Sequence, residues 1–497
     1  MKKFHQKFLI NKTHIRWFNI LDTLEHGGKA STICLSEKLS TTQRTIISDI
    51  SAIRDFFGKS IEIHSTYIGY TFQRIDSKKY DDLKHSLLDG EPLFNLIVGL
   101  FLYEPKSLGE WSDILFLSES SFKRYLSIFS NILLEYDLTI ATSPVEIVGD
   151  EFAIRKFFMT FFYEADITSY TINPNLEIQS AARQFLSIIK DRNISSISFT
   201  KFCYLIYISM ERHKLGHNVF LPKELNKYKE VFMTKSLTND LDTAIFNQFK
   251  IHLPENEISF IIFILISIRK NEFPHFEQDF ISAFSNSEIL ELGNDYCAWQ
   301  EIPSVDPRFV FIHSFFTRVY LFHQLTSSYN KNILDVNYYV ETQHEQELKK
   351  TKSFLSNSKK FKDIFGTRYL FDISCSLTLF NESLVNLYVG SPKKIAFVLE
   401  GQQDIVMHTK SLIFRFLSRF QNLFFVDGSE FTEAFIQKNK IDIVVTNYPP
   451  YVENFNFSNV KVVLMNSLPT SEDWNNLLAT INPAIIKNYS LKSDYSK

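Results

Sequence analysis

Four polar side chains in the first third of the chain have the chemistry needed to read DNA bases. The outward side of one predicted helix carries Gln43, Arg44, Thr45 and Ser48. In the major groove, a Gln side chain can pair with adenine and an Arg side chain with guanine. Ser and Thr hydroxyls can bond to base edges or to phosphates. These residue types therefore predict a DNA-reading surface at positions 43–48.

A second set of polar side chains follows further along the sequence, on another predicted helix. This helix presents Ser120, Ser121, Lys123 and Arg124 outward, together with Glu119. Lys and Arg can bind phosphates or guanine, whereas a carboxylate repels the DNA backbone. We therefore expect the second surface to bind DNA less strongly than the first.

Four histidines in the middle of the chain could exchange protons, bind a ligand or accept a phosphoryl group. His213 and His217 lie in the segment 211–217, and His313 and His323 lie in one apolar run. A histidine beside a helix end suits these roles because its charge changes near neutral pH. An ordinary surface or core histidine is the competing interpretation for each of them.

The sequence lacks the short motifs of several enzyme classes. It contains no G-x-G-x-x-G, G-x-x-x-x-G-K, G-x-S-x-G or H-E-x-x-H pattern, so we expect neither a nucleotide cofactor nor enzymatic activity. The four cysteines lie far apart without a Cys-x-x-Cys pair, which disfavours a disulfide framework and a metal site. The apolar run 258–268 is too short to span a bilayer, and no signal-peptide pattern is present. We therefore expect a cytoplasmic protein with no membrane partner.

The helices that would position the DNA-reading side chains form an internal repeat. Apolar residues occupy positions 46, 50, 53 and 57 in one segment and 122, 126, 129 and 133 in another. This spacing predicts one amphipathic helix in each segment, with Thr42 or Ser118 at its N-cap. Ser40 with Gln43 forms a competing capping box. Two further helices are predicted before each of these helices, and a hairpin-like segment after it.

Three helices followed by a hairpin is the order of a winged helix-turn-helix, which lays its third helix in the major groove. We predict two such units, at 1–76 and 77–150. The first contains eleven Lys or Arg against seven Asp or Glu, a net charge of +4, and the second contains six against twelve, a net charge of −6. Because phosphate neutralisation supplies most sequence-independent affinity, the first unit is the stronger candidate for DNA binding. Helical core modules without DNA contacts are the alternative.

The remaining chain changes character at about residue 392. Helix-compatible apolar runs dominate before that point and fit two helical bundles, at 151–276 and 277–388. From 392 to 497, short β-rich runs alternate with helical segments, which predicts an α/β domain with a parallel sheet. The chain has 497 residues, 45% of them hydrophobic, and a net charge of −3. It is therefore predicted to be a multi-domain, mainly α protein whose nucleic-acid surface is local.

Two winged helix-turn-helix units, two helical repeats and an α/β domain together resemble the Mga family of virulence and global transcriptional regulators of Gram-positive bacteria. Two local patterns contribute to the resemblance, Leu-Ser-Thr-Thr-Gln-Arg-Thr-Ile-Ile-Ser-Asp-Ile at 39–50 and Glu-Arg-His-Lys-Leu-Gly-His at 211–217. The resemblance implies a regulator that binds double-stranded DNA. It covers essentially the whole chain.

The resemblance also implies that the helical repeats are phosphotransferase-system regulation domains (PRDs). In such domains, phosphocarrier proteins of sugar uptake phosphorylate histidines and thereby tune activity. Arg212 and Gly216 match the Arg-x-x-x-Gly pattern of the first domain, which points to His213 and His217. In the second domain we favour His313, followed by His323. The segment 203–210 departs from the family pattern, because it contains no histidine before the Arg.

The C-terminal domain resembles the enzyme IIB component of sugar permeases, in which a phosphorylated cysteine follows the first strand. Here that loop reads Leu-Glu-Gly-Gln-Gln at 399–403, so phosphocysteine transfer is not expected. We expect an interaction or dimerisation module instead, and hence a homodimer. Two alternatives remain open. One is an RNA-binding antiterminator that carries PRDs, and the other is a phosphotransferase component fused to regulatory domains.

Overall fold

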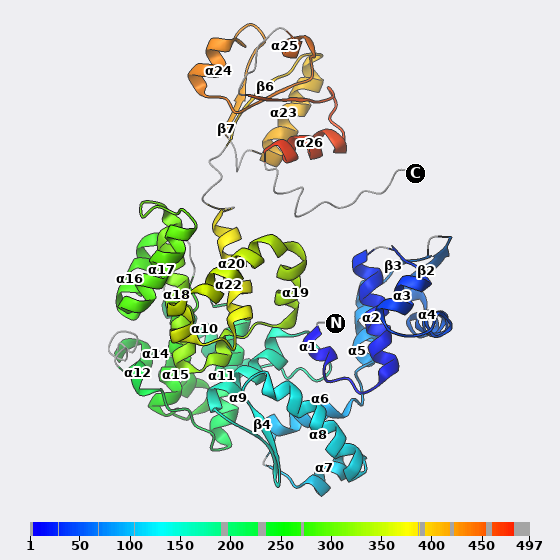
Figure 1. Ribbon diagram of the computed structural model, residues 1–497, viewed down its shortest axis with the longest axis vertical. Coiled ribbons are helices and arrows are strands. Elements are labelled where there is room, and N and C mark those ends of the chain that lie inside the picture. The colour runs from blue at the N-terminus through cyan, green and yellow to red at the C-terminus, as the bar shows by residue number, and fades with distance from the viewer. Residues whose placement is uncertain are drawn as a thin grey trace. The chain divides into compact units, whose positions relative to one another are not determined.

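The computed structural model of the chain describes residues 3–27, 29–67, 69–103, 105–189, 197–226, 235–269, 273–385, 387, 393–417, 422–453 and 460–481. Contacts divide the chain into two compact units, residues 1–379 and 380–497. Among the described residues, the first unit is helical apart from two small antiparallel sheets, and the second contains a four-stranded parallel sheet (Figure 1). The predicted mainly helical, multi-domain architecture is confirmed at this level.

Helices and a small sheet form the first part of the chain. Its elements are α1 (Lys3–Gln6), α2 (Lys12–Gly27), β1 (Lys29–Ala30), α3 (Thr32–Lys38), α4 (Gln43–Phe57), η1 (Gly58–Ser60), β2 (Ile61–Thr66), β3 (Gly69–Arg74) and α5 (Ser77–Ser86). Helix α4 buries residues 46, 50, 53 and 57, as their spacing predicts. Strand β3 pairs antiparallel with β2 on one side and with β1 on the other, and Ile63 lies opposite Phe72.

Helix α5 belongs by its contacts to this first part. The buried ring of Tyr80 lies 5.1 Å from the ring of Phe57, centroid to centroid. The Lys84 ammonium lies 3.0 Å from a carboxylate oxygen of Glu25 on α2. A boundary between residues 76 and 77 would therefore separate α5 from the helices that it contacts.

The second part repeats the order of the first. Its elements are α6 (Pro92–Leu102), α7 (Leu108–Ile114), α8 (Glu119–Leu134), β4 (Thr139–Thr142) and β5 (Val145–Val148). Helices α3 and α7 have the same length, and one constant offset in residue number relates the starts of α3 and α4 to those of α7 and α8. Strands β4 and β5 pair as a two-stranded hairpin. The internal repeat inferred from apolar spacing is therefore present in the backbone.

The two third helices of the repeat begin in the same way. The Thr42 hydroxyl accepts a hydrogen bond from the Thr45 backbone N–H at 3.1 Å, and the Ser118 hydroxyl accepts one from the Ser121 N–H at 3.2 Å. Both residues are N-caps, as predicted. The competing capping box does not form, because Ser40 lies in the turn before α4 with φ of 48°.

The N-terminal residues belong to a core beyond the first part. Phe4 and Phe8 are buried, and their rings lie 6.4 Å from the ring of Phe157, centroid to centroid. The Phe8 ring also lies 6.2 Å from that of Phe129 on α8. A variant that lacks the N-terminus would therefore expose the core between α8 and the next helix.

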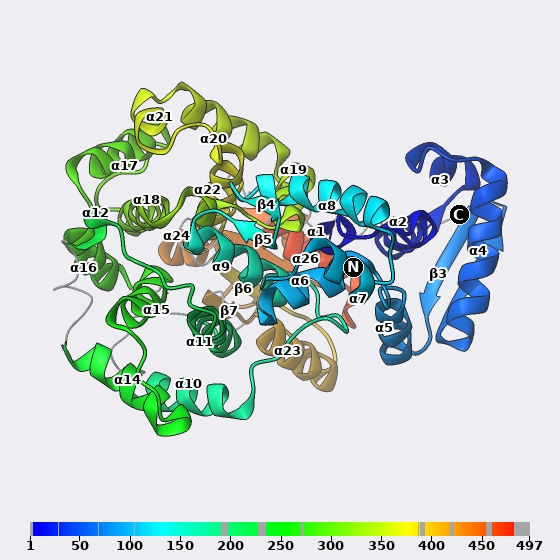
Figure 2. The ribbon, with the colours of Figure 1, turned by 90° about the horizontal axis from the view of Figure 1, so that it is seen from below.

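The elements described between residues 151 and 384 are all helical. Their bounds are α9 (Glu151–Met159), the π-helical η2 (Thr160–Glu164), α10 (Leu176–Ile189), α11 (Phe199–Lys214), α12 (Lys223–Asn226), α14 (Lys235–Phe249), α15 (Glu255–Ser267), α16 (Pro274–Phe284), α17 (Ser287–Trp299), α18 (Pro307–Leu325), η4 (Ser327–Asn330), α19 (Leu334–Gln343), α20 (Glu345–Asn357), α21 (Lys359–Phe365) and α22 (Leu370–Leu384). Helices α10 and α14 lie side by side (Figure 2). The predicted division between residues 276 and 277 falls inside α16, so a boundary between two bundles would lie before Pro274 or after Phe284.

Helix α15 contains most of the longest apolar run of the sequence. Every residue from 257 to 267 is buried, which agrees with the predicted buried helix. The described part of the chain contains no helix with the length and hydrophobicity needed to cross a membrane.

The second unit is built around a parallel sheet in the order β7-β6-β8-β9. Its elements are β6 (Lys394–Val398), α23 (Gln403–Leu417), β7 (Asn422–Phe425), α24 (Glu433–Asn439), β8 (Ile443–Thr446), α25 (Pro450–Glu453), β9 (Lys461–Leu464) and α26 (Ser471–Ile481). Alternate residues of β6 point to opposite faces, so Ile395 and Phe397 pack with α23 and α26, whereas Ala396 and Val398 pack with α24. The predicted parallel sheet is confirmed.

Candidate nucleic-acid interface

The exposed side of α4 carries three of the four side chains that the sequence assigns to DNA reading. Gln43, Arg44 and Ser48 are exposed. Thr45 is only half-buried, and its hydroxyl lies 2.9 Å from that of Thr42. The structure therefore places Thr45 in the first turn of α4, bonded to the N-cap residue Thr42, and leaves the other three side chains accessible to a ligand.

One residue of this surface was missed by the sequence analysis. Ile47 lies between Arg44 and Ser48 on α4, and its side chain is 54% exposed. An exposed apolar side chain on a reading helix can contact the methyl group of thymine. Its position in the helix predicted its exposure, but its residue type suggested a core role.

A buried carboxylate fixes α4 against α2. Asp49 is 5% exposed, and its carboxylate accepts hydrogen bonds from Arg16 Nε at 2.8 Å and from Trp17 Nε1 at 3.1 Å. The hydrogen bond to Asp49 raises the pKa of the Arg16 guanidinium. These bonds hold the reading helix at a defined angle to the helix behind it.

Replacing Asp49 with alanine should therefore loosen α4. Arg16 and Trp17 together lose three hydrogen bonds to this carboxylate, and the expected cost is about 2 kcal/mol of unfolding free energy. Hydrogen exchange measured by mass spectrometry should show faster exchange of the α4 amides. Asp55→Ala is the matched control, because Asp55 is exposed on the same helix. Equal exchange in the two variants would contradict a positioning role for Asp49.

The hairpin of the first part is tied to the end of α4. The Arg54 Nε atom donates a hydrogen bond to the backbone oxygen of Ile63 at 2.9 Å, and the guanidinium also donates to the Ser65 hydroxyl at 3.0 Å. At the tip of the hairpin, Tyr67 is 94% exposed. A hairpin held in this way can present its tip to a phosphate backbone beside the helix.

The equivalent surface on α8 has a different charge pattern. Ser120, Lys123 and Arg124 are exposed, whereas Ser121 is half-buried and bonds to the Ser118 hydroxyl at 3.0 Å. The Lys123 ammonium lies 3.8 Å from a carboxylate oxygen of Glu119 one turn earlier. This carboxylate partly neutralises Lys123, and it lies at the end of the helix that would approach DNA. That the α8 surface binds DNA less strongly than the α4 surface stays a prediction.

Two candidate regulatory histidines flank the end of α11. His213 Nδ1 lies 2.5 Å from Asn218 Oδ1. His217 lies in a cavity of about 130 Å³ whose wall also includes Arg212, Lys214 and Glu146 of β5. Burial, and then the charge of Arg212, lowers the pKa of the His217 imidazole. Both side chains are half-buried, and the structure brings them to one end of one helix.

A buried ion-pair network lies behind these histidines. The Arg155 guanidinium contacts Glu257 through two hydrogen bonds of 2.6 and 2.9 Å, and its Nε atom lies 3.0 Å from Glu151. Arg212 also binds Glu151, at 2.7 and 2.9 Å. Arg155 Nη2 donates a hydrogen bond to the backbone oxygen of His217 at 2.9 Å. The network thereby joins α9, α11 and α15 to the histidine loop, and the sequence analysis did not find it.

His313, which the sequence analysis favoured in the second bundle, is a core residue. It is 4% exposed, with Nδ1 2.7 Å from the Phe309 backbone oxygen and Nε2 3.1 Å from Asn294 Oδ1. Its ring lies against Gly293 of α17, where an added Cβ would come within 2.7 Å of the ring. His323 is half-buried, with its ring 5.4 Å from that of Phe365, centroid to centroid. His323 is therefore the more accessible of the two.

The burial of His313 has a consequence for stability at acidic pH. Burial lowers the pKa of its imidazole below the usual 6.5, so the unfolded chain takes up a proton more readily than the folded protein. The stability that neutral His313 contributes is complete above about pH 6.5 and is lost as the pH falls below that value. His313→Gln should therefore show a smaller decrease of the urea midpoint between pH 7.5 and pH 5.5 than the wild type. The exposed His408 provides the control variant His408→Gln, and equal decreases in all three proteins would contradict the prediction.

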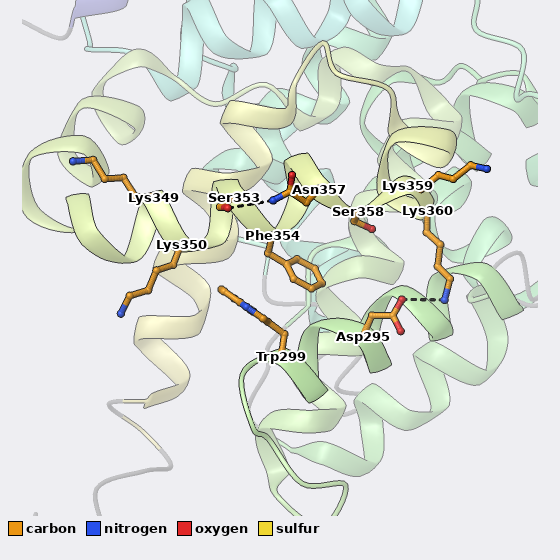
Figure 3. Close-up of a pocket in the computed structure, with 10 residues that line it drawn as sticks. All are labelled: Asp295, Trp299, Lys349, Lys350, Ser353, Phe354, Asn357, Ser358, Lys359 and Lys360. Carbon is orange, nitrogen blue, oxygen red and sulfur yellow. Dashed lines mark hydrogen bonds and ion pairs between the residues drawn. The ribbon is translucent and has the colours of Figure 1, made fainter.

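A groove of about 800 Å³ lies between α17 and the pair α20 and α21. Figure 3 shows ten of the residues that line it. Its floor contains Trp299 and Phe354, whose ring centroids lie 5.0 Å apart. Of the four lysines that line it, Lys360 binds Asp295 and Glu291 at 2.9 Å, and Lys349 binds Glu345 at 2.5 Å. Because these carboxylates neutralise two of the lysines, the groove is an apolar surface with a weakly charged rim. The described residues contain no group of three or more His, Cys, Asp or Glu side chains that could hold a metal ion.

The second part of the repeat matches a known family of helix-turn-helix domains. Residues 76–162 match the family model described as the Mga helix-turn-helix domain. This span contains α5 to α9 with β4 and β5, and therefore the whole second copy. The predicted resemblance to Mga regulators is confirmed.

Relatives of the chain are named as regulators. The chain is 21% identical over 496 residues to the capsule synthesis positive regulator AcpB of Bacillus anthracis, and the alignment covers 93% of this chain and 97% of the relative. It is 23% identical over 227 residues to a trans-acting regulator of Streptococcus pneumoniae serotype 4, with 44% of each chain covered. It is also 24% identical over 236 residues to the capsule synthesis positive regulator AcpA of Bacillus anthracis, with 45% of this chain and 46% of the relative covered.

Proposed function

We propose that this Mga-like chain is a transcriptional regulator that binds promoter-region double-stranded DNA through its N-terminal winged helix-turn-helix units. The proposal rests above all on α4. This helix exposes Gln43, Arg44 and Ile47, and Asp49 holds it against α2. The family match to the second copy supports the same kind of contact for α8. Both helices would enter the major groove, and the hairpins would lie along phosphates.

We assign the larger share of the affinity for DNA to the first copy of the repeat, residues 1–76. Its net charge of +4 attracts the phosphate backbone, whereas the net charge of −6 of segment 77–150 repels it. Arg44 forms no ion pair within the described part of the chain, so its guanidinium is available to guanine or phosphate. Lys123, by contrast, is held near Glu119.

The rest of the chain would regulate this activity. We assign PRD-like roles to the two helical segments, which begin at residue 151 and near residue 277, and an enzyme IIB-like role in homodimerisation to the segment from about 392. Phosphocarrier proteins of the sugar phosphotransferase system would phosphorylate histidines of the helical segments. His213 and His217 suit this role better than His313, because both ring nitrogens of His313 are bonded inside the core. Such a regulator would act in the cytoplasm and would need no catalytic activity of its own.

The test is fluorescence anisotropy of the full chain with labelled promoter-region duplexes and with RNA hairpins of the same length. Affinity for duplex DNA that exceeds affinity for RNA, and that falls steeply as salt rises, is the expected result. A preference for RNA hairpins would favour the antiterminator alternative. Transfer of a phosphoryl group from the protein to a sugar would favour the phosphotransferase alternative.

A further inference from the structure

A cavity of about 320 Å³ lies inside the first compact unit, where α9, η2, α11 and α15 meet α18, η4 and α19. Its apolar wall includes Leu205, Ile264, Phe322 and Val336. A cavity of about 150 Å³ already accommodates a benzene ring. The space is therefore large enough for a small metabolite.

The polar part of the wall is rich in amines. Lys156, Lys201 and Lys331 line the cavity, and Glu164 is the acidic residue among them. Lys156 Nζ lies 2.6 Å and Lys201 Nζ lies 3.6 Å from carboxylate oxygens of Glu164. Burial alone would raise the pKa of Glu164, but the two ammonium groups lower it to about 2. The Glu164 carboxylate therefore pairs with both ammonium groups and stays ionised.

Lys331, the third lysine of the wall, also shares its carboxylate partner with another lysine. Lys331 Nζ lies 3.2 Å from a carboxylate oxygen of Glu135, and Glu135 also accepts a hydrogen bond from Lys7. The Lys331 side chain is 11% exposed and lies over the Tyr136 ring, 5.3 Å from its centroid. Around the cavity, four ammonium groups therefore share the carboxylates of Glu135 and Glu164.

A third carboxylate, that of Asp372, offsets part of this positive charge, so four ammonium groups face three carboxylates. Asp372 acts on Lys156 through its charge, but its oxygen accepts hydrogen bonds from the Asn332 N–H at 2.9 Å and from Asn337 at 3.0 Å. The Tyr329 hydroxyl, in contrast, forms no hydrogen bond within the described residues, although Tyr329 lines the cavity. An excess of partly buried positive charge is costly unless an anion compensates it.

We propose that this cavity binds a small organic anion, a carboxylate or phosphate group carried on an apolar body. The acidic group would contact the amines of Lys201 and Lys331, and the Tyr329 hydroxyl would donate to it. The apolar body would pack against Leu205, Ile264 and Phe322. This site is independent of the proposed DNA contacts, because none of its wall residues lies on α4 or α8.

The test is isothermal titration of the full chain with four probes that share one ring. Benzoate carries a carboxylate, phenyl phosphate a phosphate, benzyl alcohol no charge and benzylamine a positive charge. At least one anionic probe should bind with a Kd of about 1 mM or tighter, and the other two probes at least tenfold more weakly. Binding of benzoate alone would identify a carboxylate ligand, and binding of phenyl phosphate alone would identify a phosphate ligand.

Two variants and a matched control localise the binding. Lys201→Met and Lys331→Met keep most of the side-chain length but remove the charge, and each should weaken the bound anion about tenfold. Lys350→Met removes an exposed lysine of α20 and should change nothing. Lys201 is 30% exposed, so its variant should fold, and circular dichroism would verify this. The proposal is overturned if neither anionic probe binds at about 10 mM, or if binding is unchanged in both folded variants.

Discussion

Replacing Glu257 with alanine is expected to destabilise the first helical segment by about 3–5 kcal/mol. The side chain is fully buried, and it accepts two hydrogen bonds from Arg155 and one from the Val219 backbone N–H at 2.9 Å. Removing it leaves the Arg155 guanidinium, which is 2% exposed, with Glu151 as its remaining carboxylate partner. A buried cation that has lost a bidentate partner costs far more than the pair itself contributes.

Urea unfolding followed by circular dichroism, with hydrogen exchange of the α9, α11 and α15 amides, would measure this effect. Glu255→Ala is the matched control, because Glu255 lies on the same helix and is exposed. Its effect should stay below about 1 kcal/mol, the scale of a charge at a helix N-terminus. An unfolding midpoint of Glu257→Ala equal to that of the control would show that the network does not hold these helices together.

Replacing Arg44 with alanine should lower the affinity for duplex DNA by about 10- to 100-fold, which corresponds to about 1–3 kcal/mol. The Arg44 side chain is exposed on the first turns of α4. The substitution should therefore leave the stability of the protein unchanged, and anisotropy at fixed salt would report binding alone.

Arg124→Ala on α8 provides the comparison for Arg44→Ala. Arg124 is also exposed, but its guanidinium lies 5.3 Å from the Tyr125 ring centroid and its segment is acidic. We expect a smaller loss of affinity for this variant. A larger loss for Arg124→Ala than for Arg44→Ala would assign the dominant contact to the second copy.

The sequence predicted the structural features that depend on residues close together in the chain. The apolar spacing at 46, 50, 53 and 57 predicted α4, and the hydroxyls of Thr42 and Ser118 predicted where the repeated helices begin. These features are local, because a helix needs only one apolar face and a capped first turn. The internal repeat added independent support, since both copies reach the same order of elements. The strands of the parallel sheet were predictable for the same reason.

The sequence could not predict contacts between distant residues. Arg155 and Glu257 lie 102 positions apart, and Arg16 and Asp49 lie 33 positions apart. Which carboxylate meets which guanidinium is decided by helix packing, which periodicity does not specify. The burial of His313 depends in the same way on Gly293 of a neighbouring helix. For this reason the candidate histidines were identified by type, but their accessibility was not.

The most direct measurement of the central claim is DNA cleavage by an iron chelate attached to a single cysteine on α4. Ser51→Cys on α4 and Ser127→Cys on α8 form a matched pair, because both serines are exposed and they occupy equivalent positions in the two copies of the repeat. Cys34 is exposed and would be replaced by Ser in both proteins, whereas Cys203, Cys297 and Cys375 are buried. We predict cleavage of a bound promoter duplex from position 51, at least as strong as from position 127. Cleavage from position 127 alone, or from neither position on bound DNA, would contradict the assignment of α4 as the principal reading helix.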